Sequence, residues 1–302
     1  MITPSTVLMV KPWTFGYDAE SASSNAFQKE SKHPEADRLK AIAEYEAAIE
    51  KIAAAGIEVI SYEEKSPAPL PDAVFPNNWI GLHPGGRVII YPMAHSSRQL
   101  EKEQEVIPAL IDAGHRPVES IDLSEYEQEE RYFEGTGSMV IDYRNKKAYA
   151  CISPRTDLNL FRQVCELLEL EDISFRSTDL NGQEIYHTNV MMAITEKLAI
   201  VCMESIENLL ERKMLEQNFI KDKLELIDLN QQQINHFCGN VFEAKSKNGD
   251  SYLICSQQAW DHFTEAQQAI ISRHHKPLPI DIETIERIGG GSARCMVAGV
   301  YF

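Results

Sequence analysis

The sequence predicts an α/β fold in which five strand–strand–helix–strand modules surround a pseudo-fivefold axis. Two observations lead to this prediction. Aromatic residues followed by polar clusters recur roughly every 54 residues. Each cluster is followed by two apolar runs around a polar turn, which is the pattern of a β-hairpin, and then by a helical pattern and one more short strand. An ordinary doubly wound α/β sheet gives no reason for such a period.

Four of the clusters begin with an aromatic residue, and the fifth lies about one period further along the chain. They are Phe75–Asn78, Phe133–Thr136, Tyr186–Asn189, Phe237–Asn240 and Gly291–Cys295. The expected hairpins are 79–82 with 87–91, 138–142 with 147–152, 190–194 with 198–203, and 241–244 with 251–255. The fifth hairpin requires 296–302 to pair with 6–11. This pairing would close the ring, remove free sheet edges and make residues 1–302 a single domain.

The helices and the last strand of each module follow from local patterns. Apolar residues at helical spacing between Leu39 and Ile52 predict a helix that ends at Gly56. Further helices are expected at 98–113, with Pro108 as a kink or a late start, and at 157–170, 204–217 and 257–273. Asp157 is suited to cap the second of these. Strands are expected at 57–62, 116–121, 173–177, 224–229 and 278–282.

Residues 12–35 fit none of these elements. They are rich in Ser, Ala, Asp and Glu, and they include Trp13, Phe15, Tyr17 and Phe27. A loop of this length in a compact domain is either disordered or functional. The aromatic residues favour a lid over the mouth of the ring.

Composition restricts the class of partner. The 302 residues carry a net charge of −17, which argues against nucleic acid or an anionic membrane surface. The six cysteines form no C-x-x-C pair. No apolar segment approaches the roughly 18 residues that span a bilayer, and no signal peptide is evident. We therefore expect a reduced, cytoplasmic protein that acts on a small molecule, while its oligomeric state, a homo-oligomer included, stays open.

The polar clusters would meet at one mouth of the axis. They contribute Asn77, Asn78, Glu134, His187, Asn189, Cys238, Asn240 and Cys295. As a thiolate, Cys295 could attack an electrophilic carbon, and His187 could protonate the leaving amine and then activate water. Taken singly, each has a plainer interpretation, since most cysteines are inert buried thiols and most histidines are simply hydrogen-bonded. We assign the plainer role to Cys238. The long separations between His187, Cys238, Cys295 and His236 disfavour a zinc site.

These motifs resemble those of the guanidine-modifying superfamily, the penteins. The superfamily includes the arginine deiminases, the dimethylarginine dimethylaminohydrolases and the amidinotransferases. Leu70–Asn78 resembles the segment "PDSVFVED", and Phe133–Gly135 resembles the start of "EGGD". Ser96–Arg98 resembles "SRR", Ser153–Thr156 resembles "S-x-R-T", and the segments around His187 and Cys295 resemble the catalytic regions. The resemblance covers nearly the whole chain and implies a five-bladed α/β propeller.

Position by position, the resemblance implies a site that needs no metal and no organic cofactor. Cys295 would be the nucleophile, His187 the general acid and base, and Glu134 a ligand of the substrate nitrogens. Arg98 and Arg155 would bind the α-carboxylate of an amino acid. Taken by itself, each arginine could equally form an ordinary surface ion pair. Asn77, Asn78, Asn189 and Phe75 complete the expected substrate-binding set.

The chain departs from the superfamily at four carboxylates. Asn77 and Asn78 replace the "ED" pair, Gly137 replaces the last Asp of "EGGD", and Asn189 replaces an Asp of the deiminases. A buried guanidinium needs charge compensation, which an amide cannot supply. A neutral ureido group, as in citrulline, suits the amides better, and a branch described as citrulline-utilization hydrolases is most similar to this chain. The sequence predicts hydrolysis of a C–N bond in an arginine- or citrulline-like amino acid. An amidinotransferase with the same chemistry, or a non-catalytic binding protein, remains the alternative.

Overall fold

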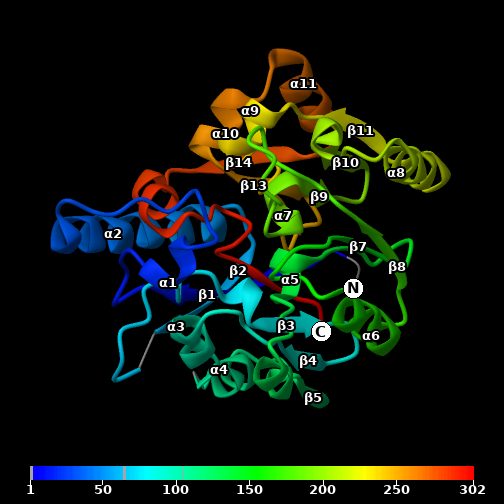
Figure 1. The fold of residues 1–302 in the computed structure, drawn as a ribbon. Coiled ribbons are helices and arrows are strands. Elements are labelled where there is room, and N and C mark those ends of the chain that lie inside the picture. The colour runs from blue at the N-terminus through cyan, green and yellow to red at the C-terminus, as the bar shows by residue number, and fades with distance from the viewer. Residues whose placement is uncertain (1–2, 64–65, 104) are drawn as a thin grey trace.

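The computed structural model describes residues 3–63, 66–103 and 105–302 and confirms the α/β class. Its strands form one sheet of six and three sheets of three (Figure 1). The six-stranded sheet has the order β2 (Glu58–Glu63), β1 (Thr6–Lys11), β15 (Ala298–Val300), β3 (Ile80–His83), β4 (Arg87–Ile90), β5 (Glu119–Asp122). The smaller sheets are β6 (Val140–Asp142), β7 (Lys147–Cys151) and β8 (Glu171–Phe175); β9 (Met192–Ile194), β10 (Leu198–Val201) and β11 (Glu225–Asp228); and β12 (Phe242–Lys245), β13 (Ser251–Ser256) and β14 (Lys276–Ile280).

One pairing scheme recurs through these sheets. An antiparallel pair is followed by a parallel neighbour in β3–β4–β5, β6–β7–β8, β9–β10–β11 and β12–β13–β14. The two ends of the chain make the same arrangement. β15 is antiparallel to β1, with Thr6 opposite Val300, and β1 is parallel to β2. The first strands of all five groups line a cavity of about 80 Å³.

The longer helices lie outside the strands (Figure 1). The longer helices are α2 (Pro34–Ala54), α4 (Val106–Asp112), α6 (Leu158–Leu168), α8 (Leu209–Lys221), α10 (Gln257–His262) and α11 (Glu265–His274). The short ones are α1 (Ala19–Ala22), α3 (Ser96–Gln99), α5 (Gly135–Ser138), α7 (Thr188–Met191) and α9 (Gln231–Asn235); of these, α5 and α7 lie near the middle of the molecule (Figure 1). Among these helices, none is both long enough and apolar enough to cross a membrane.

Local capping explains where the expected helices were wrong. The helix expected at 257–273 is two helices, because Ser256 caps α10 and Thr264 starts α11 with a capping box. The helix expected at 204–217 is shifted, because Asn208 caps α8. The segment 98–113 also breaks. Pro108 falls in the first turn of α4, where no backbone N–H is needed.

Residues 12–35 were expected to lack regular structure, which is wrong at two places. Asp18 caps the short helix α1 through the backbone N–H groups of Glu20 and Ser21. Pro34 occupies the first turn of α2, so the last two residues of the segment are helical. The remainder is irregular, and its polar side chains contact the candidate site described below.

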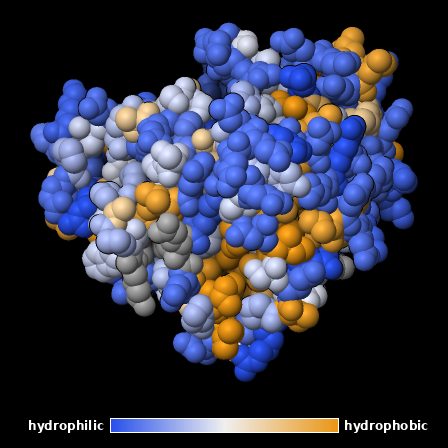
Figure 2. All heavy atoms as spheres, turned by 60° about the horizontal axis from the view of Figure 1, so that its bottom comes forward, coloured by the Kyte–Doolittle hydropathy of each residue, from blue (hydrophilic) through white to orange (hydrophobic). Residues whose placement is uncertain are grey.

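The surface is largely hydrophilic, with one apolar area on the face that carries α4 and β5 (Figure 2). Ile111 in α4 and Val118 beside β5 are among the exposed large hydrophobic residues, with 45% and 80% of their surface exposed. The buried hydrophobic residues form four clusters between the strands and the outer helices.

Candidate active site

The candidate residues lie at equivalent places, just before the first strand of each group. Asn77 and Asn78 end the 3₁₀ helix Pro76–Asn78 before β3. Glu134 precedes α5 and β6, and His187 precedes α7 and β9. Cys295 lies three residues before β15. Because these strands line one cavity, the turns before them bring together side chains from distant parts of the chain.

Glu134 and His187 form a buried pair. His187 Nε2 lies 2.7 Å from Glu134 Oε2, and the two residues are 3% and 0% exposed. Burial opposes ionisation of Glu134, but the charge of Arg155 and the bond from His187 outweigh it and lower the pKa of this carboxyl. Burial also lowers the pKa of His187, and the bond to Glu134 opposes this only in part. The site therefore has an ionised carboxylate that orients a neutral imidazole at pH 7.

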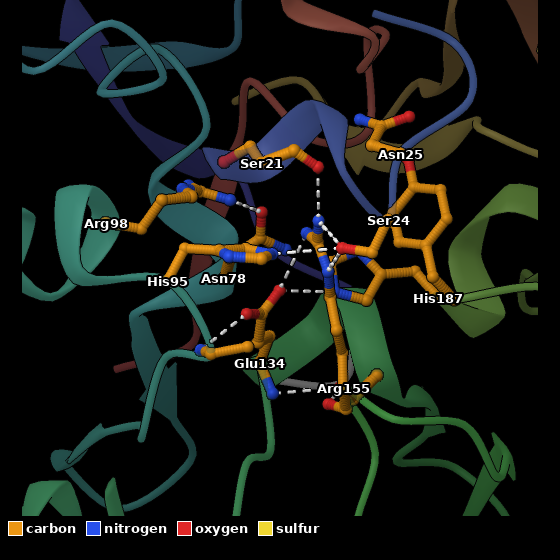
Figure 3. Close-up of polar contacts among 12 residues, drawn as sticks. Ser21, Ser24, Asn25, Asn78, His95, Arg98, Glu134, Arg155 and His187 are labelled. Carbon is orange, nitrogen blue, oxygen red and sulfur yellow. Dashed lines mark hydrogen bonds and ion pairs between the residues drawn. The ribbon is translucent and has the colours of Figure 1, made fainter. Parts of the chain in front are cut away.

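Arg155 is the second partner of Glu134 and carries a positive charge. Its Nη1 lies 3.4 Å from Glu134 Oε2, and its other nitrogens donate to Ser24 Oγ and to the Ser21 carbonyl (Figure 3). The guanidinium also lies 4.9 Å from the ring centre of Tyr186. Arg155 thus joins the candidate site to the segment that contains α1.

Two asparagine amides surround the sulfur of Cys295. The Sγ atom lies 3.4 Å from Asn189 Nδ2 and 3.2 Å from Asn240 Nδ2. Cys295 is 7% exposed. Helix α7 links His187 to Cys295. His187 directly precedes this helix, and Asn189, which contacts the Cys295 sulfur, lies within it.

The glycine run before Cys295 allows close packing. A Cβ atom on Gly291 would lie 2.8 Å from the ring of Phe75, so that a side chain there would displace Phe75. Gly290 has a φ of 64°, in the left-handed region that favours glycine. The ring of Phe75 therefore packs against the loop that carries Cys295.

Asn78 is held by Arg98. Arg98 Nη1 donates to Asn78 Oδ1 at 2.7 Å, and its other nitrogens donate to both oxygens of Glu101 and to the Phe75 carbonyl. Four hydrogen bonds therefore engage this guanidinium, which the sequence had assigned to a substrate carboxylate. The Nδ2 atom of Asn78 has no hydrogen-bond partner within the described ranges. It would lie 2.3 Å from a Cβ on Gly137, beside the ring of His187.

The sequence analysis missed the residues that reach the site from the segment before α2. We call residues 18–28 the strap. Its Asn25 donates to the Gly290 carbonyl, and its Gln28 donates to both oxygens of Asp72 and to the Gly289 carbonyl. Asp72 lies in the quoted segment Leu70–Asn78 but had not been singled out. The sequence alone did not reveal that Asp72 is buried. Burial raises the pKa of Asp72 to about 6, although the charge of Arg98 opposes this rise.

The residues considered for zinc do not come together. Cys238 is buried and contacts the Ala259 carbonyl, and His236 stacks on His262 at 3.5 Å. Across the described ranges, no group of three or more His, Cys, Asp or Glu side chains is placed to hold a metal ion. Beside the site, Arg155 and Tyr186 line a larger pocket of about 870 Å³ together with strap residues.

Solved structures share this fold. The chain aligns with ArgZ, an arginine dihydrolase from the ornithine-ammonia cycle in Cyanobacteria, at 17% identity and a TM-score of 0.74. The alignment covers 98% of this chain but only 40% of ArgZ, so the chain spans about two fifths of that protein. It covers 97% of the N-terminal domain of ArgZ in a cysteine-to-serine variant bound to substrate, at 16% identity and a TM-score of 0.75. A dimethylarginine dimethylaminohydrolase adduct aligns at 15% identity and a TM-score of 0.64, covering 99% of this chain and 100% of that one.

These likenesses establish the fold. No curated protein sequence matches the chain significantly. The family model described as "N,N dimethylarginine dimethylhydrolase, eukaryotic" matches residues 11–302. This match covers nearly the whole chain, and the chain therefore belongs to the N,N-dimethylarginine dimethylhydrolase family.

Proposed function

We propose that the protein is a thiol-dependent hydrolase of a C–N bond in a guanidino or ureido amino acid. One observation carries the proposal. Beside Cys295 and the Glu134–His187 pair, three asparagine atoms are buried without a partner among the residues that the structure describes: Asn77 Oδ1, Asn78 Nδ2 and Asn189 Oδ1. Buried polar atoms normally have hydrogen-bond partners, so unpaired ones at a candidate site point to a ligand that supplies them.

The ligand chemistry follows from these atoms. One is a donor and two are acceptors, and none carries a charge. A ureido group offers one C=O acceptor and several N–H donors, which complements them. A guanidinium offers donors only and brings a positive charge, and Glu134 is already paired with Arg155 and His187. We therefore expect the ureido form to bind better.

The residues then act in two steps. The Cys295 thiol gives its proton to the neutral His187, and the thiolate attacks the ureido carbon. A C–S bond forms while the C–N bond breaks, and His187 passes that proton to the leaving nitrogen, which departs as ammonia. Water next attacks the same carbon, His187 accepts its proton, and the C–S bond breaks. Glu134 orients His187 and stabilises its protonated form. The carbamate that leaves decomposes to an amine and carbon dioxide.

Three further residues would position the amino-acid end. Arg155 offers a guanidinium to the α-carboxylate once the strap groups leave it, and Asp72 is a buried carboxylate suited to an ammonium group. Arg98 is engaged by Glu101 and Asn78, so we assign it to holding Asn78 rather than to touching substrate.

The repeated pairing scheme supports a five-bladed arrangement. Five groups of three strands, each with its first strand on one cavity, are what a pseudo-fivefold propeller requires. In that arrangement every blade contributes one turn to the candidate site. We infer that the site depends on the closure of the ring by β15 and β1.

The relatives favour a hydrolase over an amidinotransferase. ArgZ is an arginine dihydrolase, and variants of its N-terminal domain include a cysteine-to-serine form bound to substrate and an asparagine-to-serine form bonded covalently to a reaction intermediate. In this chain we likewise propose a cysteine, Cys295, as the nucleophile and asparagines as contacts of the substrate. No feature of the site favours an amine acceptor over water.

The test compares citrulline, arginine and N,N-dimethylarginine as substrates. Released ammonia, ornithine and dimethylamine are quantified for the wild type, for Cys295→Ala and for Cys165→Ala as a matched control in α6. We expect turnover to be fastest with citrulline, lost in Cys295→Ala and retained in Cys165→Ala. Acid quenching during turnover should trap a covalent adduct on Cys295.

Two outcomes would contradict the proposal. Much faster turnover of arginine or dimethylarginine would overturn the ureido preference while leaving the thiol chemistry in place. If none of the three is turned over and no adduct forms, the hydrolase proposal is wrong and a binding protein is favoured. Product formed only when glycine or ornithine is added would instead identify a transferase.

A further inference from the structure

The amide of Asn240 has a single favourable orientation. Its Oδ1 accepts from the backbone N–H of Arg294 at 3.0 Å, and its Nδ2 lies 3.0 Å from the Asn189 carbonyl. Exchanging Nδ2 and Oδ1 would place a donor against the Arg294 N–H and an acceptor against the Asn189 carbonyl. Because both contacts would become repulsive, the Nδ2 group is held toward Cys295.

The sulfur of Cys295 therefore faces two amide donors, of which the Asn240 amide is held in a fixed orientation. Asn240 Nδ2 lies at 3.2 Å and Asn189 Nδ2 at 3.4 Å, and both asparagines are 1% exposed. The sulfur also lies 3.6 Å from Asn240 Oδ1, which can accept from a thiol S–H but is already used by Arg294. Donors stabilise a thiolate more than a thiol, since the negative charge makes the sulfur a stronger acceptor.

The charges around the sulfur are consistent with a stabilised thiolate. Within the part of the chain that the structure describes, the Arg294 guanidinium forms no ion pair. It donates to the Val297 carbonyl and lies 4.8 Å from the ring centre of Phe242. Cys295 is one of the groups that act electrostatically on it, together with Tyr301 and Tyr143. The imidazole of His187 is engaged by Glu134 instead.

We infer that Asn240, together with Asn189, stabilises the thiolate form of Cys295 and is a further catalytic residue. The inference rests on the proposed role of Cys295 as nucleophile. Asn240 contacts the reacting sulfur itself, and the thiolate is the nucleophilic form of cysteine. In this site two neutral amides supply the stabilisation that a neighbouring imidazolium supplies in other thiol enzymes.

The experiment measures the rate at which iodoacetamide alkylates Cys295, as a function of pH and read by peptide mass spectrometry. The variants are Asn240→Ala, which removes the donor, and Asn240→Asp, which keeps an acceptor for the Arg294 N–H but places a carboxylate oxygen against the sulfur. The control is Asn248→Asp, which adds the same charge at an exposed turn. The other five cysteines are at most 1% exposed and should react slowly.

We expect the midpoint of the alkylation profile to rise by about one pH unit or more in Asn240→Asp, by less in Asn240→Ala, and not at all in Asn248→Asp. Wild-type profiles in both Asn240 variants would overturn the inference. Circular dichroism checks that each variant folds. If neither Asn240 variant folds, the same alkylation profile is measured for Asn189→Ala. Alkylation requires no substrate, so its result stands even if the proposed hydrolysis fails.

Discussion

At the scale of single residues, the site is defined by close approaches among buried polar groups. The Cβ position of Gly137 lies 2.3 Å from Asn78 Nδ2 and 2.8 Å from His187 Nδ1. Here the superfamily pattern has a carboxylate, and this chain has no side chain at all. The space is taken by an unpaired amide and by the imidazole that we propose as acid and base.

We expect Gly137→Ala to abolish most of the activity because the new methyl group must displace Asn78 or His187. A misplacement of about 1 Å in a catalytic group can cost roughly a hundredfold in rate, and the overpacking should cost about 1–3 kcal/mol of stability. The measurement is kcat/KM together with Tm. Gly16→Ala is the matched control, since nothing lies within 4 Å of its Cβ position. Full activity in Gly137→Ala would show that Asn78 and His187 do not need this space.

The buried carboxyl of Asp72 makes stability depend on pH. Burial raises its pKa from 3.8 to about 6, so the folded protein holds this proton more tightly than the unfolded chain does. The resulting stabilisation is fully present below pH 3.8 and is lost as the pH rises through 6. The difference amounts to roughly 3 kcal/mol.

Asp72→Asn should remove this dependence while keeping an acceptor for Gln28. We expect the variant to gain up to roughly 3 kcal/mol in unfolding free energy relative to the wild type between pH 4 and pH 7. Urea unfolding at several pH values measures it. The exposed Asp281→Asn is the control and should follow the wild type. A constant difference between Asp72→Asn and the wild type across this range would contradict the prediction.

At the scale of elements, the strap is held to the site by polar side chains. Asp18 accepts from Ser97, Ser24 contacts Arg155, and Gln28 bonds Asp72 and Gly289. The contacts of Ser24 and Gln28 occupy groups that we assign to substrate binding or to the cysteine loop. A substrate would replace the strap's polar groups with its own, which is the behaviour expected of a lid.

Gln28→Ala should loosen the strap. The variant loses its bonds to Asp72 and Gly289, and such bonds are worth about 1–3 kcal/mol when a charged group takes part. Hydrogen exchange of residues 18–28 should therefore accelerate about five- to a hundredfold, while the strands keep their protection. Ser23→Ala is the control in the same segment, because within the described part of the chain its hydroxyl bonds only the Glu20 carbonyl. Unchanged exchange in Gln28→Ala would mean that other contacts hold the strap.

At the scale of the whole molecule, the two ends of the chain meet in one sheet. β15 lies between β1 and β3, so the last strand joins the first group of strands to the second. The same strand follows directly on the loop that carries Cys295. Closure of the fold and placement of the candidate nucleophile therefore depend on one short strand.

A chain that ends at Val297 should lose cooperative unfolding, because β1 and β3 would be left with unpaired edges and a cluster of apolar residues would open. A chain that lacks only Phe302 keeps β15 and should retain a sharp transition. Differential scanning calorimetry compares the two. A cooperative transition in the shorter chain would show that β15 does not unite the fold.

Local patterns in the sequence were enough to predict the α/β class and the strand pairs near 80–90, 140–151, 192–201 and 242–256. Hairpins and turns are encoded by neighbouring residues, so a pattern of apolar runs around a turn identifies them. Helix ends were less predictable. The break between α10 and α11 depends on the two caps Ser256 and Thr264, which lie within an otherwise continuous helical pattern.

The sequence by itself determined the superfamily, the candidate residues Cys295, His187 and Glu134, and the replacement of carboxylates by amides, since all of these are readable as motifs. Only the tertiary structure decided what each group contacts. Arg155 meets the Ser21 carbonyl across 134 residues, and Asn25 meets Gly290 across 265. Contacts of this kind depend on how the sheets and the strap pack together, so no local pattern could pair Arg98 with Asn78 or place Asn240 against the sulfur of Cys295.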